Sequence, residues 1–169
     1  MPLASIRYRF RQSLPASLEE AYRWCTDFRD DDSRYFPPGL RRRVKWLAPD
    51  TLTQEDRRKD GRRTVRKLRL IRLLPEQRSW SNTHLEGPNR FSQFFYRLRP
   101  KGPRRCVLEF TALHLERTAR SLTDAERRRR ARELARQDRA VWRRFARAIA
   151  AERADAPPRS SRRLGKPTR

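Results

Sequence analysis

Glycine, histidine and cysteine are all scarce in this chain of 169 residues. None of the five glycines stands in the spacing of a phosphate-binding loop, so a glycine-rich nucleotide cradle is excluded. The two cysteines, Cys25 and Cys106, are too far apart in the chain for a CxxC redox pair and match no zinc motif. We expect both to be small buried side chains, which form a disulfide only if the fold brings them together.

Long apolar runs are missing as well. No apolar stretch approaches the roughly 18 residues that span a bilayer. Residues 1–7 lack the apolar stretch of a secretory signal. The acidic run at residues 30–32 has neither the alternating spacing nor the distal glutamate of a calcium loop. We therefore expect a soluble cytoplasmic protein that holds no metal and no cofactor.

Acidic residues are few relative to basic ones. The chain has 44 lysines and arginines against 20 acidic residues, which gives a formal charge of +24, and most of the basic residues are arginines. Such a charge attracts polyanions, although arginine spread over nearly every segment is equally typical of a codon-biased genome. A polyanion-binding module would bind RNA, DNA or an anionic membrane weakly and without sequence preference. Its phosphate-binding residues would be Arg7, Arg9, Arg11, Arg43, Arg127 and Arg128.

The first half of the chain shows the periodicity of strands. Ile6, Tyr8 and Phe10 alternate with arginines, which predicts a strand with one buried and one solvated face. Ser17 and Glu20 then form the capping box of a helix, and a second short helical turn is expected near residues 34–36. Six further strands are separated by turn signals, and consecutive hairpins of this kind imply an antiparallel sheet. These strands are expected at residues 40–47, 51–58, 62–74, 79–86, 90–99 and 104–116, with a bulge near residues 68–70.

A long helix follows the last strand. Thr123 and Glu126 form its capping box. Behind the box an apolar stripe recurs at helical spacing, while the other faces carry arginine. The stripe consists of Ala131, Leu134, Ala135, Val141, Trp142, Phe145, Ala148 and Ile149. We expect one domain over residues 1–153 and a disordered basic tail over residues 154–169.

The opening strand at residues 6–10 is followed at once by the helix segment at residues 15–22, and a hairpin joins residues 96–100 to residues 104–107. This order of elements resembles the START-like superfamily, also called SRPBCC or helix-grip proteins, and in particular its polyketide cyclase/dehydrase and lipid-transport members. The resemblance covers residues 3–152. It implies an α+β fold in which a curved antiparallel sheet of six to seven strands wraps around the long C-terminal helix, with one or two short helices after the first strand.

The same resemblance implies an apolar cavity with a few polar groups between sheet and helix. Our leading hypothesis is the non-catalytic binding or carriage of a hydrophobic small molecule, such as a lipid, a polyketide or a quinone-like compound. A cyclase/dehydrase-like enzyme, with His84 as acid or base, is an alternative. A structural role explains His84 better than catalysis does, either as a core histidine with its hydrogen bonds satisfied or as a residue on a partly exposed sheet face. The candidate ligand-binding residues are Trp46, Trp80, Asn82, His84, Phe91, Gln93, Phe95, Trp142 and Phe145.

Overall fold

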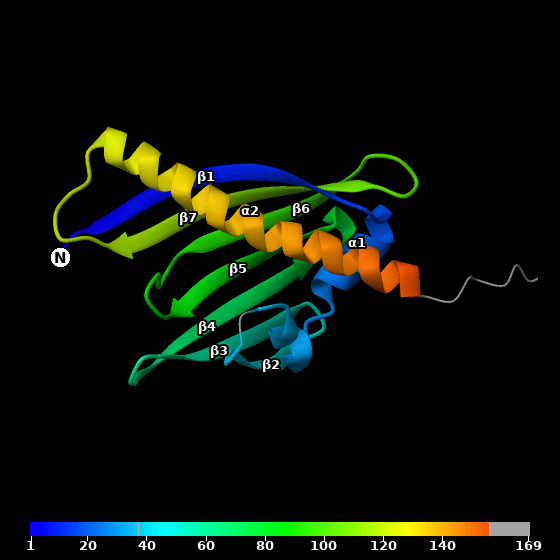
Figure 1. Cartoon of the computed structure of the whole chain (residues 1–169), viewed down its shortest axis with the longest axis horizontal. Helices are drawn as coiled ribbons and strands as arrows, with labels where there is room; N and C mark the ends of the chain where they lie inside the picture. The colour runs from blue at the N-terminus through cyan, green and yellow to red at the C-terminus, as the bar shows by residue number, and fades with distance from the viewer. Residues whose placement is uncertain (37, 156–169) are drawn as a thin grey trace, which may run out of the picture.

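A seven-stranded antiparallel sheet and one long helix make up most of the molecule (Figure 1). The computed structural model describes residues 1–36 and 38–155. The strands lie in the order β1-β7-β6-β5-β4-β3-β2, so that only β1 and β7 are neighbours far apart in sequence. The elements are β1 (Leu3–Leu14), α1 (Leu18–Thr26), η1 (Asp30–Tyr35), β2 (Arg41–Ala48), β3 (Thr51–Asp60), β4 (Arg63–Leu74), η2 (Pro75–Gln77), β5 (Ser79–Glu86), β6 (Gln93–Pro100), β7 (Cys106–Arg117) and α2 (Asp124–Asp155).

The expected fold class is confirmed. The sheet is open and curved, and α2 crosses one of its faces along most of the length of the molecule (Figure 1). Two short helices, α1 and η1, follow the first strand. No helix in the described ranges is long and apolar enough to cross a membrane. The basic tail expected from residue 154 begins inside α2, and residues 156–169 lie outside the described residues.

Both predicted capping boxes are present as hydrogen bonds. At the start of α1, the Glu20 amide donates to Ser17 Oγ at 3.3 Å, and the Ser17 amide donates to the Glu20 carboxylate at 3.0 Å. At the start of α2, the Glu126 amide donates to Thr123 Oγ1 at 3.3 Å, and the Thr123 amide donates to the Glu126 carboxylate at 2.9 Å. Each box satisfies two amides that a helix start otherwise leaves without partners.

The pairing of β4 with β5 is irregular beside residue 68, near the predicted bulge, but the extra residue lies on β5 and not on β4. Leu68 pairs with Glu86, but its neighbour Arg69 pairs with His84, so Leu85 is the extra residue of a bulge. The bulge places Arg69 directly opposite His84. Gly87 follows with a φ of +114°, and a Cβ there would lie 3.1 Å from the carbonyl oxygen of Arg66. A glycine is therefore needed where the chain leaves β5.

The core lies between the concave face of the sheet and α2. Alternate residues of β1, including Ile6, Tyr8 and Phe10, are buried, whereas the arginines between them are exposed, as the alternation predicted. Leu134, Trp142 and Ile149 are the most deeply buried residues of the α2 stripe. The apolar stripe of α2 therefore packs on the hollow side of the sheet and not on its outer side.

Candidate functional site

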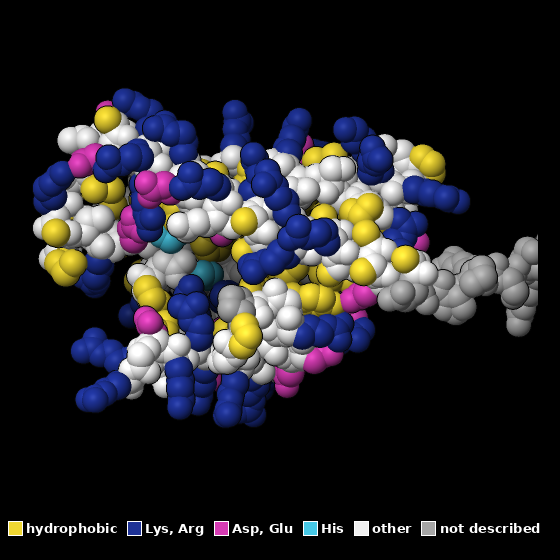
Figure 2. Space-filling view, viewed as in Figure 1, with side chains coloured by type: hydrophobic (Ala, Val, Ile, Leu, Met, Phe, Trp, Pro, Cys, Tyr) yellow, Lys and Arg dark blue, Asp and Glu magenta, His cyan; other side chains and the backbone are white. Residues whose placement is uncertain are grey.

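A cavity of about 400 Å³ remains between the concave face of the sheet and α2. All seven strands supply residues to its floor, α2 forms its roof, and α1 with the η1 region forms one rim. Figure 2 shows the hollow between α2 and the strands below it, with histidine side chains visible inside and basic side chains around it. A cavity of this volume lies in the range typical of small-molecule sites.

Aromatic rings form one part of the cavity wall. Trp80 and Tyr96 stack with centroids 4.9 Å apart and planes 5° from parallel. Trp142 of α2 lies over both rings, at 6.2 Å from Trp80 and 5.7 Å from Tyr96. Phe145 packs edge-on against Trp142 at 5.2 Å. These flat apolar surfaces suit an aromatic ligand, since stacked and edge-on ring pairs are both favourable.

A buried ion-pair network lies at the other part of the cavity, on β2, β3 and β4. Arg42 donates to both oxygens of Asp56, from Nε at 2.8 Å and from Nη2 at 3.0 Å, and Arg69 Nη1 donates to Asp56 Oδ2 at 2.6 Å. The side chains of Arg42 and Asp56 are each only 6% exposed. The charge-assisted bonds from the two guanidinium groups outweigh burial and lower the pKa of Asp56. This carboxylate therefore fixes the geometry of both arginines.

His84 is neutral and has both ring nitrogens engaged. Arg69 Nε donates to Nε2 at 3.2 Å, so Nε2 must be the acceptor, and Nδ1–H then donates to Asn89 Oδ1 at 2.9 Å. Burial and the positive charge of Arg69 lower the His84 pKa to about 3. A histidine in this state positions Arg69 and has no free lone pair for a substrate proton, which disfavours it as a general base.

This burial makes stability depend on pH. The unfolded chain takes up the His84 proton near pH 6.5 and the folded chain only near pH 3, so the stabilisation is complete above pH 6.5 and is lost as the pH falls. Between these two pKa values, each pH unit of acidification lowers the free energy of unfolding by about 1.4 kcal/mol. Between pH 7 and pH 5, wild type should lose about 2 kcal/mol more stability than His84→Gln in urea denaturation. Identical losses in the two proteins would show that His84 protonates freely in the folded state.

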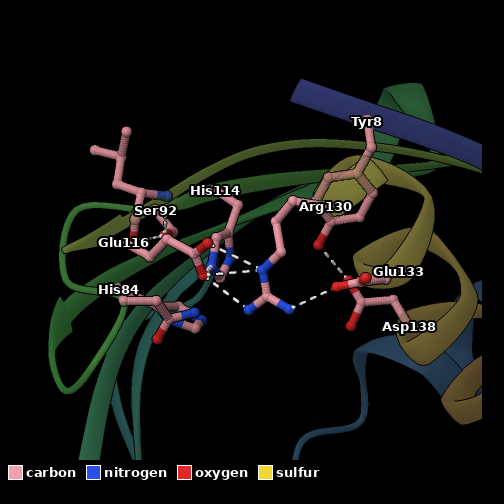
Figure 3. A network of polar contacts seen from close by, with 10 residues as sticks. Tyr8, His84, Ser92, His114, Glu116, Arg130, Glu133 and Asp138 are labelled. Carbon is pink, nitrogen blue, oxygen red and sulfur yellow. Dashed lines mark hydrogen bonds and ion pairs between the residues drawn. The ribbon is translucent and has the colours of Figure 1, made fainter. Parts of the chain in front are cut away.

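Tyr8 and Asp138 form a second polar group inside the cavity (Figure 3). The Tyr8 hydroxyl, from β1, donates to Asp138 Oδ2, from α2, at 2.5 Å. Burial raises the pKa of both groups. Tyr8 therefore keeps its proton as a donor, and Asp138 is a stronger base than an exposed aspartate. This pair can hold or accept a proton at the face of a bound molecule.

A chain of contacts beside this pair ties α2 to β7 (Figure 3). Arg130 of α2 donates to Glu116 of β7 from Nη2 at 2.8 Å and from Nε at 2.9 Å, and it reaches Glu133 at 3.3 Å. Glu116 also lies 3.2 Å from His114 Nε2. Burial nevertheless lowers the pKa of His114. The contacts fix the distance between roof and floor at this end of the cavity.

At the rim on the α1 side, the polar groups are paired with one another. Trp24 Nε1 donates to Glu152 at 2.8 Å, and the Tyr35 hydroxyl donates to the other oxygen of the same carboxylate. The rings of Trp24 and Tyr35 pack against Phe145 at 5.6 and 6.0 Å. Arg34 pairs with Asp31 at 3.1 Å. These contacts attach α1 and η1 to the C-terminal half of α2.

Five of the nine residues that the sequence suggested for ligand binding line the cavity. They are Trp80, Asn82, His84, Trp142 and Phe145. On β5 the three candidate residues share the inward face, since positions 80, 82 and 84 all reach the cavity. Asn82 Oδ1 is buried with no hydrogen-bond partner among the described residues, so it offers an acceptor to a ligand.

The other four residues do not line the cavity, and three of them, the candidates Phe91, Gln93 and Phe95 in and before β6, are therefore wrong. In β6 the inward residues are Phe94 and Tyr96, which places Gln93 and Phe95 on the outer face. Phe91 lies in the preceding turn, 54% exposed, under the guanidinium of Arg90. Trp46 lies on the edge strand β2 and is 45% exposed.

The arginines of the polyanion hypothesis lie on several elements. Arg7, Arg9 and Arg11 lie on the exposed outer face of β1, and Arg11 pairs with Glu109 at 2.7 Å. Arg43 is exposed on β2. On α2, Arg128 is exposed, while Arg127 is half-buried and donates to the carbonyl oxygen of Leu122 at 3.0 Å. Polyanion binding stays a prediction.

Several cavity residues were not suggested by the sequence: Tyr8, Arg42, Gln54, Lys67, Arg69 and Asp138. Only Asp138 carried a usable signal. It is an acidic residue four positions after Leu134 and four before Trp142, on the apolar stripe of the last helix. Among the described residues, no cluster of three or more histidine, cysteine, aspartate or glutamate side chains is arranged to hold a metal ion.

No family model matches the chain, and no curated protein matches it in sequence. Solved structures do match in shape. The Zhui aromatase/cyclase from Streptomyces sp. R1128 has a TM-score of 0.65 at 14% identity, over 88% of this chain and 93% of its own. Norcoclaurine synthase from Thalictrum flavum has a TM-score of 0.66 at 11% identity, and the match covers 92% of this chain and 90% of its own. A protein of Thermus thermophilus has a TM-score of 0.68 at 16% identity, and the match covers 89% of this chain and 99% of its own.

These likenesses establish the fold. The chain has the helix-grip fold that its order of elements predicted.

Proposed function

We propose that this protein binds an aromatic small molecule with polar substituents in the cavity between the sheet and α2. The observation that carries the proposal is the division of the cavity wall. Trp80, Tyr96 and Trp142 offer flat apolar surface, and the groups around Arg69 and Asp138 offer hydrogen bonds. Burial of the ligand's apolar area contributes about 25 cal/mol per Å², while the polar groups set its orientation.

Two further observations support binding over a fully packed core. The cavity has a volume of about 400 Å³ although aromatic side chains from the sheet, α1 and α2 all line it. The buried Asn82 Oδ1 lacks a partner in the described part of the chain, which is costly unless a bound molecule or water satisfies it. A ligand hydroxyl in contact with Asn82 would remove that cost. Helix-grip structures of similar shape include an aromatase/cyclase and norcoclaurine synthase.

The direct test is a calorimetric titration of the purified protein with 2-naphthamide, a neutral two-ring compound. We expect one binding site per chain and a Kd below about 1 mM, since a ligand of this size gains several kcal/mol from a matching apolar site. Failure of 2-naphthamide and of a panel of two- and three-ring neutral compounds to bind would contradict the proposal.

The Tyr8–Asp138 pair favours a second candidate function, a cyclase-like reaction that begins with proton abstraction next to a carbonyl. The substrate carbonyl would take the Tyr8 hydroxyl hydrogen bond away from Asp138, and Asp138, as a half-buried base with a raised pKa, would then take the proton. In D₂O the protein should then accelerate deuterium uptake at the acidic carbon of 2-tetralone, and Asp138→Asn should abolish the effect. Asp124→Asn, whose side chain is 88% exposed, is the control. Equal uptake with wild type and Asp138→Asn would exclude this role.

A further inference from the structure

One basic side chain of the cavity has no hydrogen-bond or ion-pair partner among the described residues, although the charges of Asp56 and Asp138 act on it. Lys67, on β4, lines the cavity and makes no hydrogen bond or ion pair with any of them. It pairs in the sheet with Asp56, but that carboxylate already accepts bonds from Arg42 and Arg69. The Lys67 side chain is half-buried, and a partly desolvated charge without an ion-pair partner gains from an anion that enters.

The charge balance around Lys67 is positive. Three basic residues, Arg42, Lys67 and Arg69, line this part of the cavity, and Asp56 neutralises one of their three charges. Across the cavity Asp138 accepts a hydrogen bond from Tyr8 and interacts with the charge of Lys67, but it forms no ion pair with it in the described residues. At the opposite rim Arg29 is paired with Asp27 and Arg34 with Asp31, and the carboxylate of Asp32 interacts with the charge of Arg42 rather than with that of Lys67.

A second donor lies beside Lys67. Arg69 uses Nε for His84 and Nη1 for Asp56, whereas its Nη2 makes no hydrogen bond within the described residues. Because these two bonds hold the guanidinium in place, Nη2 is pre-oriented. An ammonium group and a fixed guanidinium nitrogen together form the kind of donor pair that one carboxylate group accepts.

From this arrangement we infer that the cavity contains an anion subsite, formed by Lys67 and Arg69, and that its preferred ligands are aromatic carboxylic acids rather than neutral aromatic compounds. The inference rests on the proposed function and narrows its ligand class. The aromatic part of the ligand would lie against Trp80 and Trp142, and its carboxylate would accept from Lys67 Nζ and Arg69 Nη2. Burial and the neighbouring Arg69 and Arg58 lower the pKa of Lys67, and a bound carboxylate would counter that effect.

The experiment compares two ligands of nearly the same shape, 2-naphthoate and 2-naphthamide, by calorimetry at fixed ionic strength. Wild type should bind the acid about tenfold more tightly, the effect of one charge-assisted hydrogen bond. Lys67→Met should remove this preference and leave the Kd of the amide within about threefold. Lys45→Met is the matched control, because it removes the same charge from an exposed position on β2 outside the cavity lining. It should keep the tenfold preference.

The Lys45→Met control distinguishes binding at a local subsite from the nonspecific attraction of an anion by a protein with a charge of +24. Equal loss of the preference in Lys67→Met and Lys45→Met would overturn the subsite, as would a wild-type protein that binds the amide as tightly as the acid. In both cases aromatic binding itself would stand. If neither the acid nor the amide binds, the proposed function fails and the subsite fails with it.

Discussion

Replacing Asp56 with alanine is expected to lower the free energy of unfolding by about 3–5 kcal/mol. The carboxylate accepts hydrogen bonds from both Arg42 and Arg69, whose side chains are only 6% and 15% exposed. Without it, two nearly buried guanidinium groups lose the carboxylate that bonds to both of them. Urea denaturation at pH 7 measures the loss. Most of this loss comes from leaving the two arginines unpaired in the folded state. It is therefore larger than the net stability that the intact ion pairs contribute.

Glu55→Ala is the matched control for this variant. Glu55 is the neighbouring residue on β3 and also contacts two arginines, Arg57 and Arg66, but those side chains are 59% and 43% exposed. Exposed pairs contribute about 1 kcal/mol or less, so this variant should lose little stability. Comparable losses in Asp56→Ala and Glu55→Ala would mean that water reaches the Asp56 network freely, contrary to its burial.

Trp142→Ala is expected to cost about 3–5 kcal/mol of stability and to abolish binding of 2-naphthamide. The Trp142 side chain is buried against Trp80, Tyr96 and Phe145, with centroid distances of 5.2 to 6.2 Å. Its removal deletes the main aromatic contact between α2 and the sheet and leaves an unfilled space. Trp46→Ala removes the same side chain from a half-exposed position and should cost about 1 kcal/mol or less. A small loss for Trp142→Ala would show that α2 is not held on the sheet by this residue.

Local patterns in the sequence predicted the fold because each signal depends on near neighbours. The alternation in β1 and the two capping boxes need only a few adjacent residues, and all three are present in the structure. The inward residues of β5 were also among the candidates, because Trp80, Asn82 and His84 alternate along one face of the strand. An order of strands and helices follows from such signals alone.

The site was less predictable because it depends on register. β6 has aromatic residues on both faces, so its period of two does not say whether Phe94 or Phe95 is buried, and a shift of one residue exchanges the faces. Pairing of Phe94 with Asn82 and Ala112 decides the question, and neither pairing can be read from the segment itself.

The buried ion pairs were hidden for a different reason. Arg42, Asp56 and Arg69 come from three strands, and in a chain with 44 basic residues nothing marks two arginines as buried. Their contacts can be worked out only when the residue pairings of β2 with β3, of β3 with β4 and of β4 with β5, including the bulge in the last, are all known.

The central claim is that a ligand binds between the concave face of the sheet and α2. The four tryptophans test it most directly, because Trp24, Trp80 and Trp142 line the cavity and Trp46 does not. In a ¹H–¹⁵N spectrum followed during titration with 2-naphthamide, the indole signals of Trp80 and Trp142 should shift to saturation with one Kd, and that of Trp46 should stay in place. A saturable shift of Trp46 alone, with Trp80 and Trp142 unchanged, would place the ligand outside the cavity and contradict the account.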